Sequence, residues 1–303
     1  MAMAYILSHL ELGRRVNARL DRSRNWDEGL FLLGCLGPDV FFYDRLPPPL
    51  FRRNEKKLGN AFHNMDAASF LTAAGASPRP TAHSSLRREQ APALLLTAHC
   101  PLPTAHSSYI CGLLCHFALD AWVHPYIESR ATGPAHSRFE ALIDSRLLPG
   151  FSERDDPFAG LPPVSAAGPV DALWTDWSAA LCGKKVAGVF TRSYRNFLTV
   201  AKLLFDPHGR KSAFARCLEW PFGGKGKLSG FLVWPGRADE DDCLNMGRKP
   251  WAPPWARERV SASSFEDLFD GAAEEAVSLI GRYLDGDTIA NALAGRSMQR
   301  GAL

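Results

Sequence analysis

Histidine and aspartate recur at intervals of four residues in one apolar segment, CHFALDAWVHPY. On a helix of 3.6 residues per turn, His116, Asp120 and His124 would span only about 80° of arc, so their side chains can converge. Asp120 is the only acidic or basic residue, histidine aside, in residues 109–127. A buried carboxylate costs several kcal/mol unless it is paired or bound to a metal ion. The segment therefore predicts a buried metal-binding helix, in which Pro125 can introduce a kink and turn His124 toward a second ion.

A second segment, AHSRFEALIDSRL, also combines an imidazole and an acid at helical spacing. His136 and Glu140 fall on one helix face with Phe139, Ile143 and Leu147. Because the rest of that face is apolar, we expect the acid to point into the core of the protein.

Two more histidines lie on apolar helix faces. His9 lines up with Leu12 and Val16 in SHLELGRRVNARL, and His63 lines up with Ala67 in NAFHNMDAASFL. A single histidine in such a place is usually a hydrogen-bonded core residue, but several imidazoles and acids in a few helices favour a shared metal site. Neutral imidazole and carboxylate suit zinc, although iron or manganese could use the same ligands, and the sequence has no CxxC pair. The sequence therefore predicts an all-α, multi-helix domain with a buried polynuclear zinc site.

These segments resemble the zinc-dependent phospholipase C family, whose fold is shared with the fungal single-strand-specific nucleases. The resemblance is carried by SHLELGRRV, GPDVFFYD, HN, HFALD, HP and AHSRFEALID, which are spread over residues 5–148. It implies three zinc ions, held respectively by His63, His116 and Asp120, by His124, His136 and Glu140, and by His9 and Asp120 together with the amino terminus of the mature chain.

The same resemblance implies a general base. Asp39, in GPDVFFYD, takes the place of the family's general-base aspartate, and Asp44 in the same aromatic run is the alternative. Asp66 is more simply explained as a solvated helix residue. Replacing Asp39 is expected to spare the metal content, whereas replacing Asp120 is expected to remove up to two ions and abolish turnover.

The chain departs from the family pattern at three places. The interval from Asp120 to His124 is shorter than in the secreted Bacillus-type phospholipases, and the interval from Asp39 to His63 is longer. The tryptophan at the family's mature amino terminus is absent. Removal of the initiator methionine would expose the Ala2 amine, which we expect to fold back to the third zinc.

Zinc chemistry at such a site acts on phosphodiesters. Zinc lowers the pKa of a bound water toward about 7 and stabilises the non-bridging phosphodiester oxygens. A carboxylate such as Asp39 can orient and deprotonate the water. We therefore predict a metal-dependent phosphodiester hydrolase, closest to phospholipase C, with phospholipid or another phosphodiester as substrate. The alternatives are a nuclease-type phosphodiesterase and a noncatalytic protein with structural zinc.

Length and composition predict a single domain. The chain has 303 residues with 46% hydrophobic content, enough for one large core. We expect the metal-site half in residues 1–150 and a helical extension in residues 151–303, with helices near 171–182 and 185–206 and a last helix capped by Ser263 or Ser264. A Gly/Pro/Trp-rich loop over 219–258 could form a membrane-facing or substrate-facing rim, or anchor itself to the domain, through Trp220, Trp234, Trp251 and Trp255.

One short motif is repeated before the metal-binding helix. PTAHSS occurs at 80–85 and again at 103–108, and TAH occurs at 97–99. The repeats predict a proline-rich loop or a poorly ordered insertion over 75–108, whose histidines, His83, His99 and His106, are not expected to bind metal.

Charge and the amino-terminal sequence bear on location and partners. The net charge of +3 gives no argument for a nucleic-acid groove, although it does not exclude nucleic acid as a partner. No run of about 18 apolar residues is evident, so no transmembrane helix is predicted. MAMAYILSHLELGRR lacks a secretory signal pattern, and seven cysteines without disulfide-like spacing fit a reducing compartment. A bacterial cytoplasmic protein is expected, with peripheral membrane contact left open.

Overall fold

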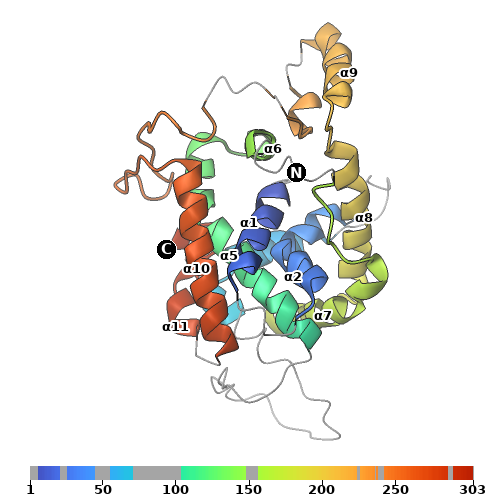
Figure 1. Ribbon diagram of the computed structural model, residues 1–303, viewed down its shortest axis with the longest axis vertical. Coiled ribbons are helices and arrows are strands. Elements are labelled where there is room, and N and C mark those ends of the chain that lie inside the picture. Colours follow the sequence, from blue (N-terminus) through green and yellow to red (C-terminus); the bar gives the residue numbers. More distant parts are fainter. Residues whose placement is uncertain are drawn as a thin grey trace, which may run out of the picture.

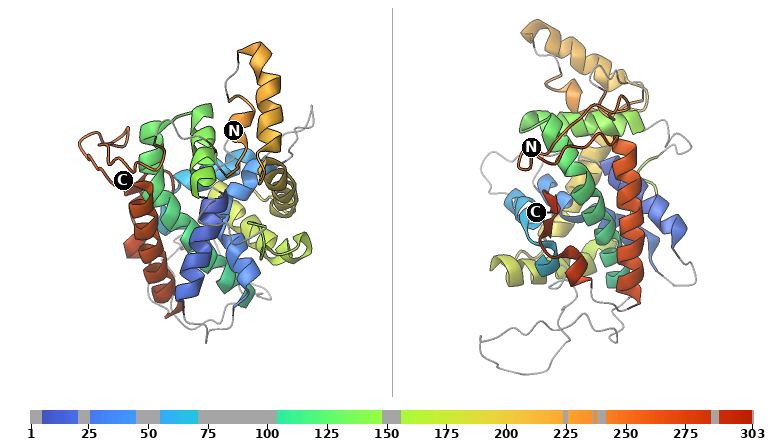
Figure 2. Two further views of the ribbon diagram at one scale, coloured as in Figure 1. Left: turned by 45° about the horizontal axis from the view of Figure 1, so that its top comes forward. Right: turned by 90° about the vertical axis from the view of Figure 1, so that its left-hand side faces the viewer.

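A central helix organises the computed structural model of the chain (Figures 1 and 2). This helix, α5 (Thr104–Arg130), is buried at every position from 108 to 121. It packs mainly against α2 (Glu28–Cys35), α10 (Phe265–Leu284) and α1 (Ile6–Arg19). The structure describes residues 6–20, 26–44, 55–70, 104–147, 156–223, 226–235, 237, 242–285 and 289–302.

The remaining elements surround this centre and are almost all helical, as predicted. The two strands among the described residues form a short antiparallel hairpin in which Arg296 pairs with Ala302 and Ser297 pairs with Gly301. The elements are η1 (Gly37–Tyr43), α3 (Lys56–Asn64), α6 (Pro134–Leu147), η3 (Val164–Ala167), α7 (Gly168–Cys182), α8 (Val189–Leu204), α9 (Arg210–Glu219), η4 (Trp220–Phe222), η5 (Ser229–Phe231), α11 (Ala290–Leu293), β1 (Arg296–Ser297) and β2 (Gly301–Ala302).

Two glycines allow α2 and α5 to touch backbone to backbone. A Cβ added at Gly112 would lie 1.9 Å from the carbonyl oxygen of Phe31, and one at Gly34 would lie 2.1 Å from that of Tyr109. Neither position has room for a side chain. The close crossing fixes α2, and with it the carbonyl of Cys35, against the histidine-bearing part of α5.

Helix α5 includes part of the segment that was expected to be a loop, and it contains Pro125. The helix begins at Thr104, so most of the second PTAHSS copy, including His106, is helical and not part of a loop. His83 and His99 lie outside the described residues. The helix also continues through Pro125 to Arg130 without ending at the proline.

The length and hydropathy of α5 alone would permit it to cross a membrane, contrary to the sequence expectation. Its segment His106–Arg130 has a mean hydropathy of 1.2 over the most apolar window, and 89% of that window is buried within the protein. A helix that is apolar on all sides and covered by neighbouring helices is typical of a protein core.

The last long helix begins where predicted. Ser264 accepts a hydrogen bond from the backbone of Asp267, and Asp267 accepts one from the backbone of Ser264, forming a capping box. The helices expected near 171–182 and 185–206 correspond to α7 and α8.

The tryptophans of the C-terminal loop have different roles. Trp251 donates its Nε1 hydrogen to the carbonyl of Ser263 at 3.0 Å and packs edge-on against Tyr126, so it anchors the loop. Trp234 is half-buried beneath the guanidinium of Arg216. Trp220, in contrast, is 86% exposed.

Candidate metal centre

The carboxylate of Asp120 lies among four histidines from three helices. Its Oδ1 is 3.2 Å from Nε2 of His9 and 3.8 Å from Nε2 of His124. Its Oδ2 is 3.2 Å from Nε2 of His116 and 3.4 Å from Nε2 of His63. The helical spacing thus brings these predicted ligands together, with His9 supplied by α1 and His63 by α3. Asp120 is 2% exposed, so this contact set is a buried one.

Asp39 belongs to the same cluster. Its Oδ1 lies 3.0 Å from Nε2 of His63, and its Oδ2 lies 3.8 Å from Nε2 of His9. Gly37, the first residue of η1, has a φ of +47°, which favours glycine. It also lies against the ring of His116, where a Cβ would be only 2.6 Å from ring atoms. Asp39 can therefore act as a metal ligand as well as a base. The geometry thus does not favour the expectation that the protein keeps all its metal ions when Asp39 is replaced.

A second ligand group adjoins the first. Nε2 of His136 lies 2.7 Å from Oε1 of Glu140, both on α6, and the rings of His136 and His124 are 5.8 Å apart. The ring of His124 is in turn 6.4 Å from that of His63. Three sets of side chains could each hold a cation, namely His63, His116 and Asp120; His124, His136 and Glu140; and His9, Asp39 and His116.

Hydrogen bonds fix the orientation of three of the imidazoles. Nδ1 of His63, His116 and His124 lies 2.7, 3.0 and 2.9 Å from the backbone carbonyls of residues 59, 35 and 298, respectively. A carbonyl can only accept, so each Nδ1 carries the hydrogen. In the neutral ring, Nε2 is then unprotonated and has a lone pair available. This is the tautomer that metal-binding histidines adopt when a carbonyl holds the other nitrogen.

The resulting contacts need a positive charge between them. Nε2 of His116 and Oδ2 of Asp120 are 3.2 Å apart and fully buried, yet neither has a partner in good hydrogen-bond geometry. A bare imidazole nitrogen and a carboxylate oxygen are both acceptors, so a cation or a proton must separate them. Oε2 of Glu140 is a third buried atom without a hydrogen bond. The residues present therefore fit a bound metal ion.

In the absence of metal, protons supply part of that positive charge. Burial opposes protonation of His63, but hydrogen bonds to Asp120 and Asp39 outweigh it and raise the pKa of His63 to about 10. Burial likewise opposes protonation of His136, while the charge of Glu140 raises the pKa of His136 to about 9. Burial raises the pKa of Glu140 to about 7, although His136 works against this shift. The cluster thus attracts cations strongly.

His116 and His124, the two candidate ligand histidines on α5, resist protonation. Burial lowers the pKa of both His116 and His124, although the charge of Asp120 works in the opposite direction. Both imidazoles therefore remain neutral at physiological pH, which is the form that binds metal.

Three residues outside the predicted set support the ligands. Glu128 Oε1 lies 3.1 Å from Nδ1 of His136 and accepts a hydrogen bond from Nε2 of Gln299 at 2.9 Å. Met298 supplies the carbonyl that holds His124. Glu128 follows His124 by four residues and could have been inferred from helical spacing. Met298 acts through its backbone carbonyl and Gln299 through its side-chain amide, and neither gives such a signal, because both lie more than 170 positions from their partners in the sequence.

The alternative aspartates have structural roles. Asp44 is fully buried, lies 2.8 Å from Nε of Arg192 and accepts the backbone N–H of Glu55 at 2.8 Å. Asp66 accepts the backbone N–H of Ser69 at 2.9 Å and so caps a helical turn instead of being simply solvated. Ala2, the proposed additional ligand, lies outside the described residues.

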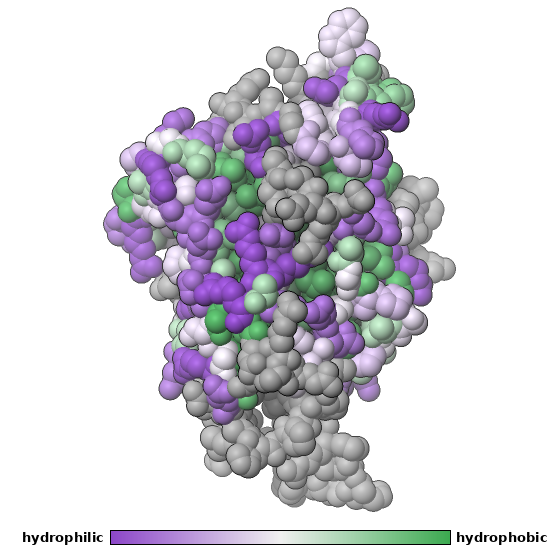
Figure 3. Space-filling view, in the orientation of Figure 1, coloured by the Kyte–Doolittle hydropathy of each residue, from purple (hydrophilic) through white to green (hydrophobic). Residues whose placement is uncertain are grey.

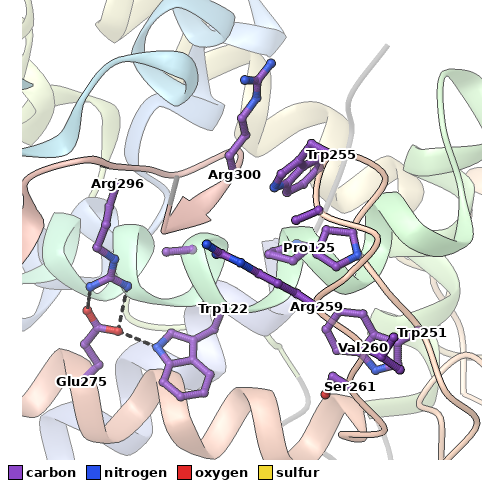
Figure 4. Close-up of a pocket in the computed structure, with 13 residues that line it drawn as sticks. Trp122, Pro125, Trp251, Trp255, Arg259, Val260, Ser261, Glu275, Arg296 and Arg300 are labelled. Atoms are coloured by element: carbon purple, nitrogen blue, oxygen red, sulfur yellow. Dashed lines mark hydrogen bonds and ion pairs between the residues drawn. The ribbon is translucent and has the colours of Figure 1, made fainter.

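A separate pocket of about 430 Å³ lies beside α5, where the C-terminal loop and the C-terminal hairpin meet that helix (Figure 4). Trp122 and Pro125 line it, together with Arg296 and Arg300 from the C-terminal hairpin; Arg296 points toward Glu275, whereas the side chain of Arg300 points away from the other lining residues. Its acidic residue, Glu275, is paired with Arg296 and accepts a hydrogen bond from Trp122. None of the candidate ligands lines this pocket.

No family model, curated protein or solved structure matches this chain. The described residues form an almost wholly helical fold in which buried histidines and acids could hold metal ions.

Proposed function

We propose that the protein is a zinc-dependent phosphodiester hydrolase of the phospholipase C type. The observation that carries the proposal is the position of Asp120, whose two oxygens face four imidazoles at 3.2 to 3.8 Å. Zinc suits this nitrogen and oxygen donor set, and the motif resemblance to the zinc-dependent phospholipases points to the same metal. Zinc bound there would supply Lewis acidity, both to activate water and to neutralise charge on a phosphodiester.

The candidate site residues differ in their exposure to solvent. Asp39 is 18% exposed and His136 is 14% exposed, whereas His9 and Asp120 are 1% and 2% exposed. Solvent and substrate would therefore approach from the side of Asp39 and His136. Burial opposes ionisation of Asp39, but its contact with His63 lowers its pKa, so it stays ionised and can orient a water and accept its proton.

Hydrolysis assays on the intact protein, with metal analysis, test this function. The expected result is zinc bound at more than one site, with hydrolysis of phosphatidylcholine exceeding that of single-stranded DNA and a generic phosphodiester. The Asp120→Ala variant should lose metal and activity, whereas Asp176→Ala, which removes an exposed aspartate of α7, should keep both. Fully coordinated zinc without turnover of any phosphodiester would favour a structural metal centre.

A further inference from the structure

Helix α9 projects from the rest of the molecule and buries none of its apolar side chains (Figures 1 and 2). Its two buried residues, Ser212 and Glu219, are both polar. A surface helix normally places an apolar stripe against its own domain. The apolar residues of α9 are thus not explained by packing against the described residues of this chain, and exposed apolar patches commonly mark a contact with a partner or membrane.

The exposed apolar residues form a patch that we call the α9 tip. Phe214 and Leu218 are 67% and 49% exposed, and their spacing places them on one face of the helix. Trp220, which directly follows the helix, is 86% exposed. Leu228 is 58% exposed and is held beside the end of α9, because its backbone N–H donates to Glu219. The outer end of the projection, at the top right of Figure 3, shows apolar and weakly polar residues.

Positive charge surrounds the α9 tip. Between residues 203 and 231 the chain has five lysines and arginines but only two acidic residues. Both acids are turned inward: Asp206 accepts the backbone N–H of Ser212 at 2.8 Å, and Glu219 accepts that of Ser229 at 2.8 Å. Among the described residues of this segment, the exposed charged side chains are Arg210, Lys211, Arg216 and Lys227.

The base of the projection packs against the helix that carries the second ligand group. A Cβ added at Gly230, in η5, would lie 2.8 Å from Cδ of Arg138 on α6. Helices α6 and α9 lie at the same end of the molecule in Figures 1 and 2. The α9 tip is therefore joined to the same part of the structure as His136 and Glu140.

We infer that the α9 tip binds the surface of an anionic phospholipid membrane. Tryptophan and aliphatic side chains enter the interfacial layer of a bilayer, and flanking lysines and arginines attract anionic head groups. The patch is a projection and not a groove, which suits insertion into a deformable surface. This inference deepens the proposed function and rests on lipid being the substrate. Its test measures membrane binding alone, so membrane binding and lipid hydrolysis can fail separately.

Co-sedimentation of the full chain with vesicles tests the inference. Vesicles of phosphatidylcholine containing phosphatidylserine should bind the protein more tightly than vesicles of phosphatidylcholine alone. Combining Leu218→Ala with Trp220→Ala should weaken binding at least about tenfold, because the apolar surface of these two side chains is no longer transferred from water into the membrane. Lys227→Ala should weaken only the phosphatidylserine-dependent part, by about fivefold. All three side chains are exposed, so the fold should be retained, as checked by thermal unfolding.

Trp255→Ala is the matched control, because Trp255 is 37% exposed but lies outside the α9 tip. Its binding should equal that of the unaltered protein. Absence of vesicle binding, or unchanged binding after the double substitution at the α9 tip, would overturn the inference. Loss of a solution oligomer in that variant, with vesicle binding unaffected, would overturn it in favour of a protein partner. Vesicle binding without hydrolysis would leave the inference standing and count against the proposed function.

Discussion

His124 donates its Nδ1 hydrogen to the backbone carbonyl of Met298 at 2.9 Å, across 174 positions of the sequence. The next residue, Gln299, donates its backbone N–H to the carbonyl of His63 at 3.1 Å and its side-chain amide to Glu128 at 2.9 Å. The short segment between β1 and β2 thus contacts two candidate ligands, His63 and His124, and also Glu128, which supports a third. The C-terminal hairpin therefore orients candidate metal ligands, while none of its own described residues belongs to a candidate ligand set.

Replacing Gln299 by alanine should weaken zinc binding without unfolding the protein. Glu128 would lose a hydrogen-bond donor, and the ring of His136 would then be held less firmly. Removing such an outer partner typically lowers metal affinity by about 10- to 100-fold. Competition with a chromophoric chelator measures the affinity directly.

Arg300→Ala provides the control for this prediction. Arg300 is the adjacent residue, but its side chain is exposed and lines the separate pocket, which contains none of the candidate ligands. Its replacement should leave zinc affinity unchanged. Equal losses in the two variants would show that the hairpin responds as a whole and that Gln299 has no specific role.

Asp39→Asn and Asp44→Asn should have different effects. Asp39 lies 3.0 Å from His63 in the cluster, so its replacement should lower turnover by about 10²- to 10⁴-fold and weaken one metal site. Asp44 is fully buried against Arg192, so its replacement should lower the melting temperature and leave the turnover of the folded protein unchanged.

Turnover, metal content and thermal unfolding of both variants distinguish these outcomes. If Asp44→Asn were the variant with reduced turnover at full metal content, the general base would be assigned to the wrong aspartate. If Asp39→Asn lost activity but kept every ion, Asp39 would act as a base alone, as the motif resemblance implied.

The candidate ligands could be found from the sequence because helices repeat at a fixed spacing. His116 and Asp120 are neighbours on any helix, and the apolar residues around them showed that the helix is buried. The meeting of α1, α3 and α6 around α5 could be inferred only through the motif resemblance, since periodicity within one helix says nothing about its neighbours.

Other features depend on tertiary packing and had no local signal. Pro125 suggested a kink, and α5 continues past it to Arg130 while packing against helices on several sides. The carbonyl of Met298 looks like any other backbone group in the sequence. The apolar residues of α9 predict a helix face, yet only the fold reveals that Phe214 and Leu218 are left uncovered.

Removal of zinc by a chelator should lower the melting temperature of the protein. A ligand that binds only the folded state at 100 times its dissociation constant adds about 2.7 kcal/mol of stability. The Asp120→Ala variant should show a smaller shift on chelation, because it has fewer ions to lose. Differential scanning calorimetry with and without chelator measures both shifts, and equal shifts would indicate that zinc binds elsewhere.

The carboxylate of Asp144 joins α6 to the first turn of α1. It accepts the backbone N–H groups of Leu7 and Ser8 at 3.1 and 3.0 Å and the hydroxyl of Ser8 at 2.5 Å. Burial raises the pKa of Asp144 to about 6, although these three hydrogen bonds oppose the shift. The pKa of an unfolded aspartate is about 3.9, so the folded protein binds this proton more tightly than the unfolded chain does.

The stability contributed by that proton is present below about pH 4 and is lost as the pH rises through about 6. Asp144→Asn should not show this loss. Relative to the variant, the unaltered protein should therefore lose on the order of 3 kcal/mol of unfolding free energy between these pH values. Urea unfolding of both proteins in chelator tests the prediction, because the remaining titrating groups are common to both and cancel in the difference. A difference that is independent of pH, or that changes in the opposite direction, would mean that the hydrogen bonds from α1 outweigh the cost of burying the charge.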